Sequence, residues 1–356
     1  MGMLTLVSLE EIKARGSIKD GDVLKLRRAL LDEPQISMAD AEALFALNDA
    51  CPIKDPAWSG FFVETIADFV VHQMQPDGYV VAEKAGWLVS KLGVGGRLRS
   101  NIELALLVHV IETARWSPPS LAAFALTQVR HAVESGSGPM RSGNAPEIGA
   151  ISQSEINLLR RVVLSFGKDV GIPVTRVEAD ALLAINRAVS PAKSSPAWTD
   201  FFVCAVGNSV LAALGRAVPT REQAFGAAVW EIPGQSTPVL QFRGFTEPGG
   251  LQVDPNANPQ FAFGGRGIGG GAGSVWSSCR PQTAEEKAMA RLERQRLEIV
   301  TNEQIEEAGE AWLVGRLDRD GCLNDNELAL LMYLQREACG LPPGLGEIAA
   351  RAMIAA

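Results

Sequence analysis

Apolar residues near the N-terminus recur with the spacing of an amphipathic helix. Val23, Leu26 and Leu30 stand at positions i, i+3 and i+7, so their side chains share one face of a helix. A polar segment containing Pro34 follows, and proline disfavours helical geometry at the residue before it. The pattern therefore predicts a helix that ends at this segment.

Two further helices are predicted in the same part of the chain. Ser37 precedes an apolar run over 38–50, and Asp40 follows three residues later, which is close to a capping box at a helix N-terminus. Pro56 suits the first turn of the next helix, where no backbone N–H is needed. The residues on one face of that helix are Trp58, Phe61, Phe62, Ile66 and Val70. Such an aromatic stripe predicts core packing rather than a ligand site.

The next stretch predicts another helix–loop–helix pair. We expect a helix that ends near Leu92, a glycine-rich turn, and a second helix from about residue 102 to about residue 114. Long alternating runs of β-branched residues, which are typical of strands, are scarce along the chain. The sequence therefore predicts an all-α fold made of helix–loop–helix pairs.

Two segments of the chain occur twice, which indicates an internal duplication. Unit A spans about 16–71 and recurs as unit A′ at about 149–214. Unit B spans about 78–133 and recurs as unit B′ at about 298–356. The matches keep nearly constant offsets, and they include Leu26-Arg27-Arg28 with Leu159-Arg160-Arg161, Asn48 with Asn186, Pro56-Ala57-Trp58 with Pro196-Ala197-Trp198, Trp87 with Trp312, and Glu103–Leu107 with Glu327–Leu331.

The duplication divides the chain into four parts. We expect a first helical domain at 1–140, the first part of a second domain at 141–216, and its last part at 298–356. The part between them, 217–297, contains Pro-Gly steps and the glycine-rich run Gly264–Gly271. This composition buries too little apolar surface to offset its ordering entropy. A flexible insertion is therefore predicted, with an exposed helix at 282–299 leading into B′.

A short pattern, Gly-x-Ile/Leu-x-x-x-Glu/Asp, precedes several expected helices. It begins at Gly16, Gly149 and Gly321 and ends at Asp22, Glu155 and Glu327; Gly78 begins a weaker version, and Glu178 keeps only the ending. The pattern resembles the second half of an EF-hand calcium-binding loop, and bacterial TerB-like helical domains share a similar arrangement. The EF-hand resemblance implies a sharp bend at the glycine, pairing of the aliphatic residue with its counterpart in a partner loop, and a last carboxylate that completes the coordination of an ion.

One loop, 316–327, keeps most of the oxygen ligands that this resemblance implies. The candidate metal ligands are Asp318, Asp320, the carbonyl group of Cys322, Asn324 and Glu327. The first ligand position holds Arg316 instead of an acid, which removes an anionic ligand and adds a positive charge near the ion. Two interpretations stay open: a calcium site that starts at Asp318, and a polar turn in which Glu327 caps the following helix. We favour the polar turn.

Net charge, cysteine content and the lack of long apolar segments limit the kinds of binding partner and the cellular location that we expect. The formal net charge of −8 argues against a nucleic-acid or anionic-membrane surface, because both require a basic face. Five cysteines without a CxxC pair fit reduced, buried thiols better than a disulfide framework. We find no uncharged apolar stretch of about 18 residues, the length of a membrane-spanning helix, and no secretory signal. We therefore expect a cytoplasmic protein with no membrane partner.

No constellation of acid, base and nucleophile is visible, and the three histidines lie far apart in predicted helices. The sequence therefore predicts a non-enzymatic scaffold for protein–protein interaction, with a protein partner, no cofactor and self-association left open. The first alternative is a calcium-binding regulatory protein that uses the 316–327 loop. The second alternative is an enzyme of an unrecognised type.

Overall fold

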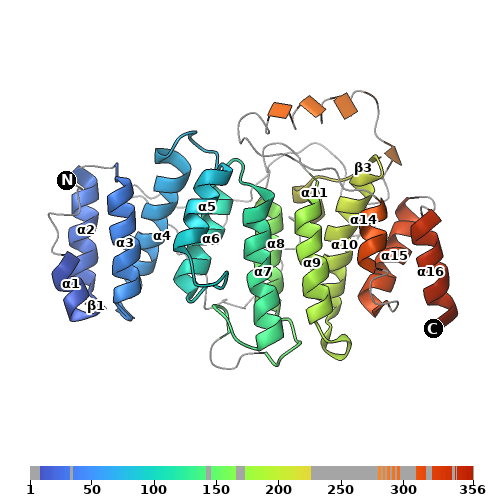
Figure 1. Cartoon of the computed structure of the whole chain (residues 1–356), viewed down its shortest axis with the longest axis horizontal. Helices are drawn as coiled ribbons and strands as arrows, with labels where there is room; N and C mark the ends of the chain where they lie inside the picture. Colours follow the sequence, from blue (N-terminus) through green and yellow to red (C-terminus); the bar gives the residue numbers. More distant parts are fainter. Residues whose placement is uncertain are drawn as a thin grey trace, which may run out of the picture.

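Helices account for most of the computed structural model (Figure 1), which confirms the prediction of an all-α fold. Short two-residue strands are the main exception. The structure describes residues 9–32, 35–141, 146–165, 173–225, 280–281, 310–317, 323–338, 341 and 343–355, and the helical residues 284, 287, 288, 291, 292, 295 and 296.

The first part of the chain is a series of helices joined by short loops. They are α1 (Leu9–Arg15), α2 (Asp20–Asp32), α3 (Met38–Ala50), α4 (Pro56–Asp68), the π-helical turn η2 (Phe69–Gln73), α5 (Ala82–Lys91), α6 (Asn101–Thr113) and α7 (Pro119–Ser135). The helix predicted over 38–50 is α3, and it begins with a capping box in which Ser37 Oγ accepts from the Asp40 N–H and Asp40 Oδ2 accepts from the Ser37 N–H. Pro56 opens α4, as predicted.

The second part of the chain adds two groups of helices. The first group comprises α8 (Gln153–Ser165), α9 (Arg176–Ala188), the 3-10 turn η4 (Pro191–Lys193), α10 (Pro196–Ala213) and α11 (Arg221–Phe225). The C-terminal group comprises α14 (Glu310–Leu317), α15 (Asp325–Glu337) and α16 (Pro343–Ala355). A second capping box, made by Thr175 and Glu178, begins α9.

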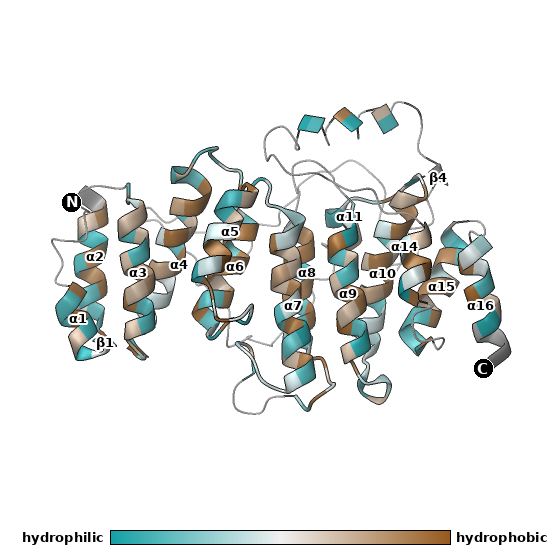
Figure 2. Ribbon diagram, viewed as in Figure 1, coloured by the Kyte–Doolittle hydropathy of each residue, from teal (hydrophilic) through white to brown (hydrophobic). Residues whose placement is uncertain are grey.

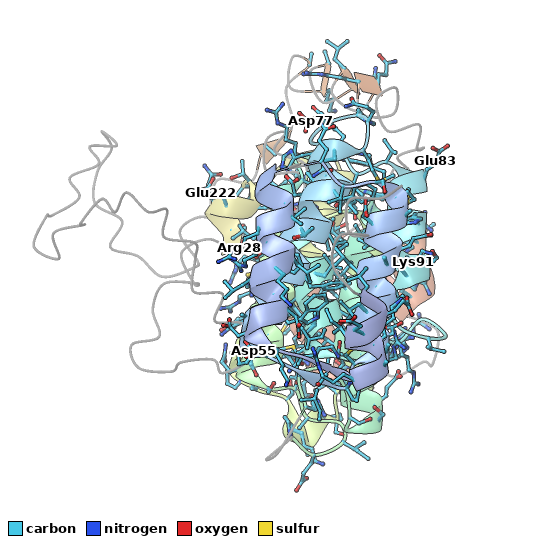
Figure 3. All side chains as sticks on the ribbon, turned by 90° about the vertical axis from the view of Figure 1, so that its left-hand side faces the viewer. Arg28, Asp55, Asp77, Glu83, Lys91 and Glu222 are labelled. Carbon is cyan, nitrogen blue, oxygen red and sulfur yellow. The ribbon has the colours of Figure 1, made fainter. Side chains whose placement is uncertain are left out.

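The helices stack in two rows along one long axis (Figure 1). One row contains α2, α4, α6, α8 and α10, each in contact with the next, and α15 then packs on α10. The other row includes the contacts of α1 with α3, α7 with α9, and α14 with α16. In the view along the long axis, charged side chains such as Arg28 and Lys91 project from opposite sides of the stack (Figure 3).

The bend at Gly16 brings two short strands together. Gly16 has a φ of 67°, a left-handed conformation that glycine adopts without steric cost. Beyond it, β1 (Ser17–Ile18) pairs in parallel with β2 (Ile53–Lys54). The glycine bend is the one expected, but Ile18 pairs with the connection between α3 and α4 rather than with a counterpart loop. In an EF-hand, the aliphatic residue pairs with the equivalent residue of a second loop. Here the segment before α2 lies beside the connection between α3 and α4, so Ile18 pairs with that connection instead.

The aromatic stripes of α4 and α10 belong to the core, as predicted. The rings of Trp58 and Phe62 are stacked with centroids 5.5 Å apart, and those of Trp198 and Phe202 lie 5.8 Å apart. All four side chains are buried. Apolar segments alternate with polar segments along the helices of both rows (Figure 2), as expected of amphipathic helices that pack on two sides.

The start of the predicted insertion at 217–297 belongs to the folded body. β3 (Arg216–Ala217) pairs in antiparallel with β4 (Arg280–Pro281), and α11 packs against α8. Buried Phe225 contacts the Phe201 ring, and this contact fixes the segment. Residues 226–279, including Gly264–Gly271, lie outside the described residues, and so does most of the helix expected at 282–299. Among the described residues, no helix has both the length and the apolar content needed to cross a bilayer.

Candidate functional site

Within the 316–327 loop, Arg316 and Leu317 end α14, and the described residues from 323 onward lead into α15. Asn324 Oδ1 accepts from the Glu327 N–H at 3.0 Å, and Glu327 Oε2 accepts from the Asn324 N–H at 3.1 Å. Both side chains therefore complete a capping box. The other candidate ligands, Asp318, Asp320 and Cys322, lie outside the described residues, so ion binding at this loop stays a prediction.

Arg316, at the first ligand position, turns toward α9. Its Nε lies 2.6 Å from Asp180 Oδ1, which also accepts from Trp312 Nε1 at 3.0 Å. The Arg187 guanidinium donates to the Arg316 carbonyl group, and its Nε lies 4.0 Å from Glu327 Oε1. Arg316 thus joins α14 to α9, and a second positive charge faces the carboxylate that would complete an ion's coordination.

Glu155, which ends the pattern in unit A′, is buried beside an arginine. Arg141 Nε donates to Glu155 Oε1 at 2.7 Å, and Arg141 Nη2 donates to Glu155 Oε2 at 3.0 Å. Each side chain is 1% exposed. Glu155 Oε2 also accepts from the backbone N–H and the hydroxyl group of Ser152, at 2.8 Å each. The carboxylate is thus fully engaged in a bidentate ion pair and a helix cap.

Glu178, which keeps the ending of the pattern, has the same kind of partner. Arg221 Nη1 and Nη2 donate to Glu178 Oε1 and Oε2 at 2.7 and 2.6 Å. Arg221 also donates to the carbonyl groups of Val163 and Pro173. A buried pair with this many hydrogen bonds is stable only as a unit, because either partner alone would be a buried, uncompensated charge.

Two carboxylates in the N-terminal half follow the same rule. Asp22 Oδ2 accepts from the Lys19 N–H at 2.9 Å and pairs with the Arg15 guanidinium. Glu103 accepts from the Arg99 N–H at 2.6 Å and from the Arg99 side chain at 2.9 and 3.1 Å. At these positions the carboxylate links a helix N-terminus to an arginine, which is a structural role.

At the weaker Gly78 pattern, a lysine takes the place of the carboxylate. Lys84 is buried, and its Nζ donates to three carbonyl oxygens at 2.8 Å each, those of Met74, Pro76 and Tyr79. Burial lowers the pKa of Lys84 to about 8, and the negative charge of Asp77 acts in the opposite direction. The three carbonyl acceptors match the three donors of an ammonium group. The positive charge in this loop is therefore the Lys84 side chain, at the position where an EF-hand loop has the carboxylate that binds the ion.

A buried polar network attaches the C-terminal helices to α9 and α10. Asn186 Oδ1 accepts from Trp198 Nε1 at 3.2 Å and from Asn326 Nδ2 at 2.8 Å, and Asn186 Nδ2 donates to Asn324 Oδ1 at 3.1 Å. Thr199 Oγ1 donates to Asn326 Oδ1 at 2.6 Å. Amides that are paired in this way rigidify an interface, so B′ folds back onto A′ across the long intervening segment.

The histidines and the described cysteines do not gather into one site. His72 Nδ1 lies 2.9 Å from Asp77 Oδ1, and burial lowers the pKa of His131 on α7. His109 lies on α6. Burial raises the pKa of the Cys204 thiol to about 11, so this thiol stays protonated and weakly nucleophilic near neutral pH.

Sequence reasoning missed Lys84, Arg141 and Arg221 as partners of the loops. The only sequence signal for Lys84 was the reversed charge at the last position of the Gly78 pattern. Within the part of the chain that the structure describes, no three or more His, Cys, Asp or Glu side chains are arranged to hold a metal ion. Comparisons with models of known protein families, with curated proteins and with solved structures find no match to this chain.

Proposed function

We propose that this protein is a non-enzymatic interaction scaffold in which a helical unit is present in two copies. The observation that carries the proposal is an ion pair found at both junctions of an A-type unit with a B-type unit. Lys91 Nζ lies 2.6 Å from Glu42 Oε1, and Arg316 Nε lies 2.6 Å from Asp180 Oδ1. The sequence offsets of the two units align Lys91 with Arg316 and Glu42 with Asp180. Arg316 is then the counterpart of Lys91 rather than a lost ion ligand.

A buried hydrogen bond supports the same correspondence. Trp58 Nε1 donates to Asn48 Oδ1 at 3.1 Å, and Trp198 Nε1 donates to Asn186 Oδ1 at 3.2 Å. These residues are matched in units A and A′. A buried indole N–H needs a hydrogen-bond acceptor in each copy of a duplicated unit. Copies of one ancestor are expected to use the same acceptor, and here both use an asparagine side chain.

The elongated shape suits contact with other proteins. In a stack of helical units, each unit is stabilised by its neighbours, and the long lateral surfaces are left available. The two rows of this chain form such a stack (Figure 1). Two side chains with a shifted pKa have structural surroundings: Lys84 donates to three carbonyl groups, and burial keeps the Cys204 thiol protonated near neutral pH. This favours a scaffold over an enzyme.

Capture with the full-length chain tests this proposal. The immobilised protein should retain at least one specific protein from a cell extract, and the purified pair should bind with a dissociation constant of about 10 μM or tighter by calorimetry. Heat-denatured protein on the same support is the control. If no retained protein binds in the purified system, and light scattering finds only monomer at cellular concentration, the scaffold proposal fails.

A further inference from the structure

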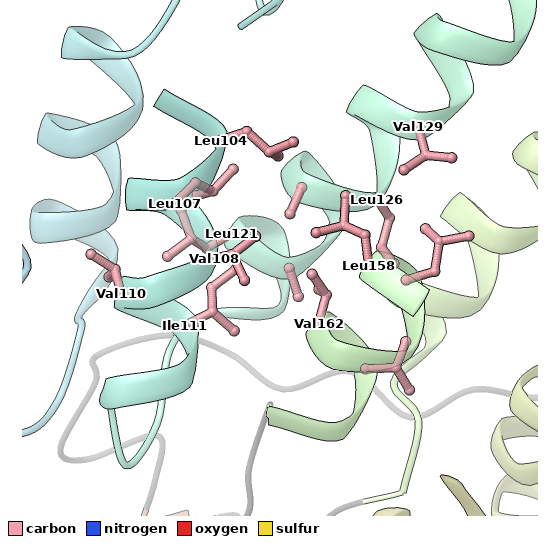
Figure 4. Close-up of a cluster of buried hydrophobic side chains, with 14 of the residues drawn as sticks. Leu104, Leu107, Val108, Val110, Ile111, Leu121, Leu126, Val129, Leu158 and Val162 are labelled. Carbon is pink, nitrogen blue, oxygen red and sulfur yellow. The ribbon is translucent and has the colours of Figure 1, made fainter. Parts of the chain in front are cut away.

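The junction between units B and A′ shows what covers one face of a unit-B helix. Val108 of α6 is 1% exposed and lies opposite Leu158 and Val162 of α8 (Figure 4). Beside this apolar contact, Arg161 of α8 donates to both carboxylate oxygens of Glu112 of α6, at 2.9 Å each. The α6 face therefore takes a helix with two aliphatic residues four positions apart and one charged residue beside them.

None of the helices that the structure describes covers the corresponding face of α15 in this way. In the register of the B and B′ match, Met332 takes the place of Val108, and Arg336 takes the place of Glu112. Met332 is 64% exposed, against 1% for Val108. The Arg336 side chain is exposed as well, and its guanidinium pairs with the neighbouring residue Glu337. Among the described residues, α15 thus exposes a helix face whose counterpart on α6 is buried in a junction.

We infer that this face of α15 binds an amphipathic helix of a partner protein that carries an acidic residue opposite Arg336. The inference rests on the proposed function and specifies the chemistry of the partner. The aliphatic residues of the partner would cover Met332 in the way that α8, with its buried Leu158 and Val162, packs on the α6 face that carries Val108. The charge at the edge is reversed relative to the inner junction, because arginine replaces Glu112, so the matching group on the partner is a carboxylate.

Charge argues against a second copy of this chain as the occupant. The counterpart of α8 in unit A is α2, which places Lys25 where α8 has Leu158 and keeps an arginine, Arg28, in the position of Arg161. Both side chains are exposed on α2, the helix near the N-terminal end of the stack (Figure 1). Tail-to-head association would bring these two cations toward Arg336, and like charges at a contact oppose binding.

Two peptides derived from α8 provide the probe. Both contain residues 153–165, carry Gln153→Lys and Asn157→Asp joined by a side-chain lactam that holds the helix, and have a fluorescein label. One peptide keeps Arg161 and is called the native peptide, and the other carries Arg161→Glu. Fluorescence anisotropy measures their binding to the full-length chain. The Arg161→Glu peptide should bind about threefold more tightly, as expected of one exposed charge pair.

Three variants of the full-length chain locate the binding face. Met332→Glu should weaken binding by about tenfold, whereas Met38→Glu, at an exposed methionine of α3, is the matched control and should have no effect. Arg336→Glu should reverse the preference and favour the native peptide. Circular dichroism should show the same helix content for all variants, since the substituted side chains are exposed.

Several outcomes overturn the inference. Lack of saturable binding up to about 1 mM peptide, equal binding by the wild type and Met332→Glu, or an unchanged preference in Arg336→Glu would each do so. A dimer of the wild type that Met332→Glu dissociates would identify a second copy as the occupant and would also overturn it. If a captured partner binds the wild type and Met332→Glu equally, the scaffold function stands and only this face is excluded.

Discussion

Replacement of Lys84 by methionine tests whether the buried ammonium group holds the loop between η2 and α5. Methionine fills much of the same space but cannot donate, so three carbonyl oxygens at 2.8 Å lose their charged donor. One buried acceptor left unpaired costs about 1–3 kcal/mol. If one or two of the three acceptors stay without a partner, the free energy of unfolding at neutral pH should fall by about 2–5 kcal/mol.

The depressed pKa of Lys84 adds a signature in pH. In the folded chain this pKa is about 8 instead of 10.5, so between these values the unfolded chain holds a proton that the folded chain has released. The stability of the wild type relative to Lys84→Met should therefore rise with pH in this window, by up to about 1.4 kcal/mol per pH unit. Well below pH 8 both states bind the proton, and the difference between the two proteins is constant.

Urea unfolding followed by tryptophan fluorescence at about pH 7, 8 and 9 measures both effects. The gap between the wild type and Lys84→Met should widen by about 1.3 kcal/mol from the lowest to the highest pH. Lys25→Met, at an exposed lysine of α2, is the control and should show neither the loss nor the pH dependence. A gap that stays constant or narrows with pH would refute the reasoning.

Three further changes test an ion pair, a helix cap and a thiol. Arg221→Met leaves Glu178 buried without its partner and should lower the free energy of unfolding by about 3–5 kcal/mol in urea titrations; adding Glu178→Gln should recover part of this loss, and an additive double variant would contradict the pairing. Glu327→Ala removes one side of the cap of α15 and should cost about 1 kcal/mol equally with and without calcium; calorimetric heat at millimolar calcium that this variant abolishes would favour a metal site instead. Cys204, with a thiol pKa of about 11, should be alkylated slowly in the native protein and rapidly in urea, as followed by mass spectrometry of its peptide; rapid alkylation without urea would contradict the burial.

Features that depend on neighbouring residues could be predicted from the sequence. The capping spacing of Ser37 and Asp40 placed the start of α3 at the observed residue, and Pro56 did the same for α4. The aromatic stripe of α4 is buried as expected. Each of these signals lies within about one helical turn, and the physics that produces it acts over that distance.

The partners of the charged loop residues could not be predicted in this way. Asp22 pairs with an arginine seven residues away, whereas Glu178 pairs with Arg221, 43 residues away. The number of residues between two partners does not identify the pair, because only the packing of the helices brings the two side chains together. The same holds for Lys84, whose acceptors are backbone carbonyl groups that any residue type supplies.

The antiparallel pairing of β3 with β4 joins residues 216–217 to 280–281. A connection whose two ends meet at one place can vary in length at little cost to the body that anchors it, because doubling a closed loop adds only about 0.6 kcal/mol of entropy. The connection between β3 and β4 is therefore a site where the chain can accept an insertion. A fluorescent or affinity domain inserted between β3 and β4, beyond α11, should leave α10 and α15 in register, and evolution could lengthen or shorten the same stretch without rebuilding the helical stack.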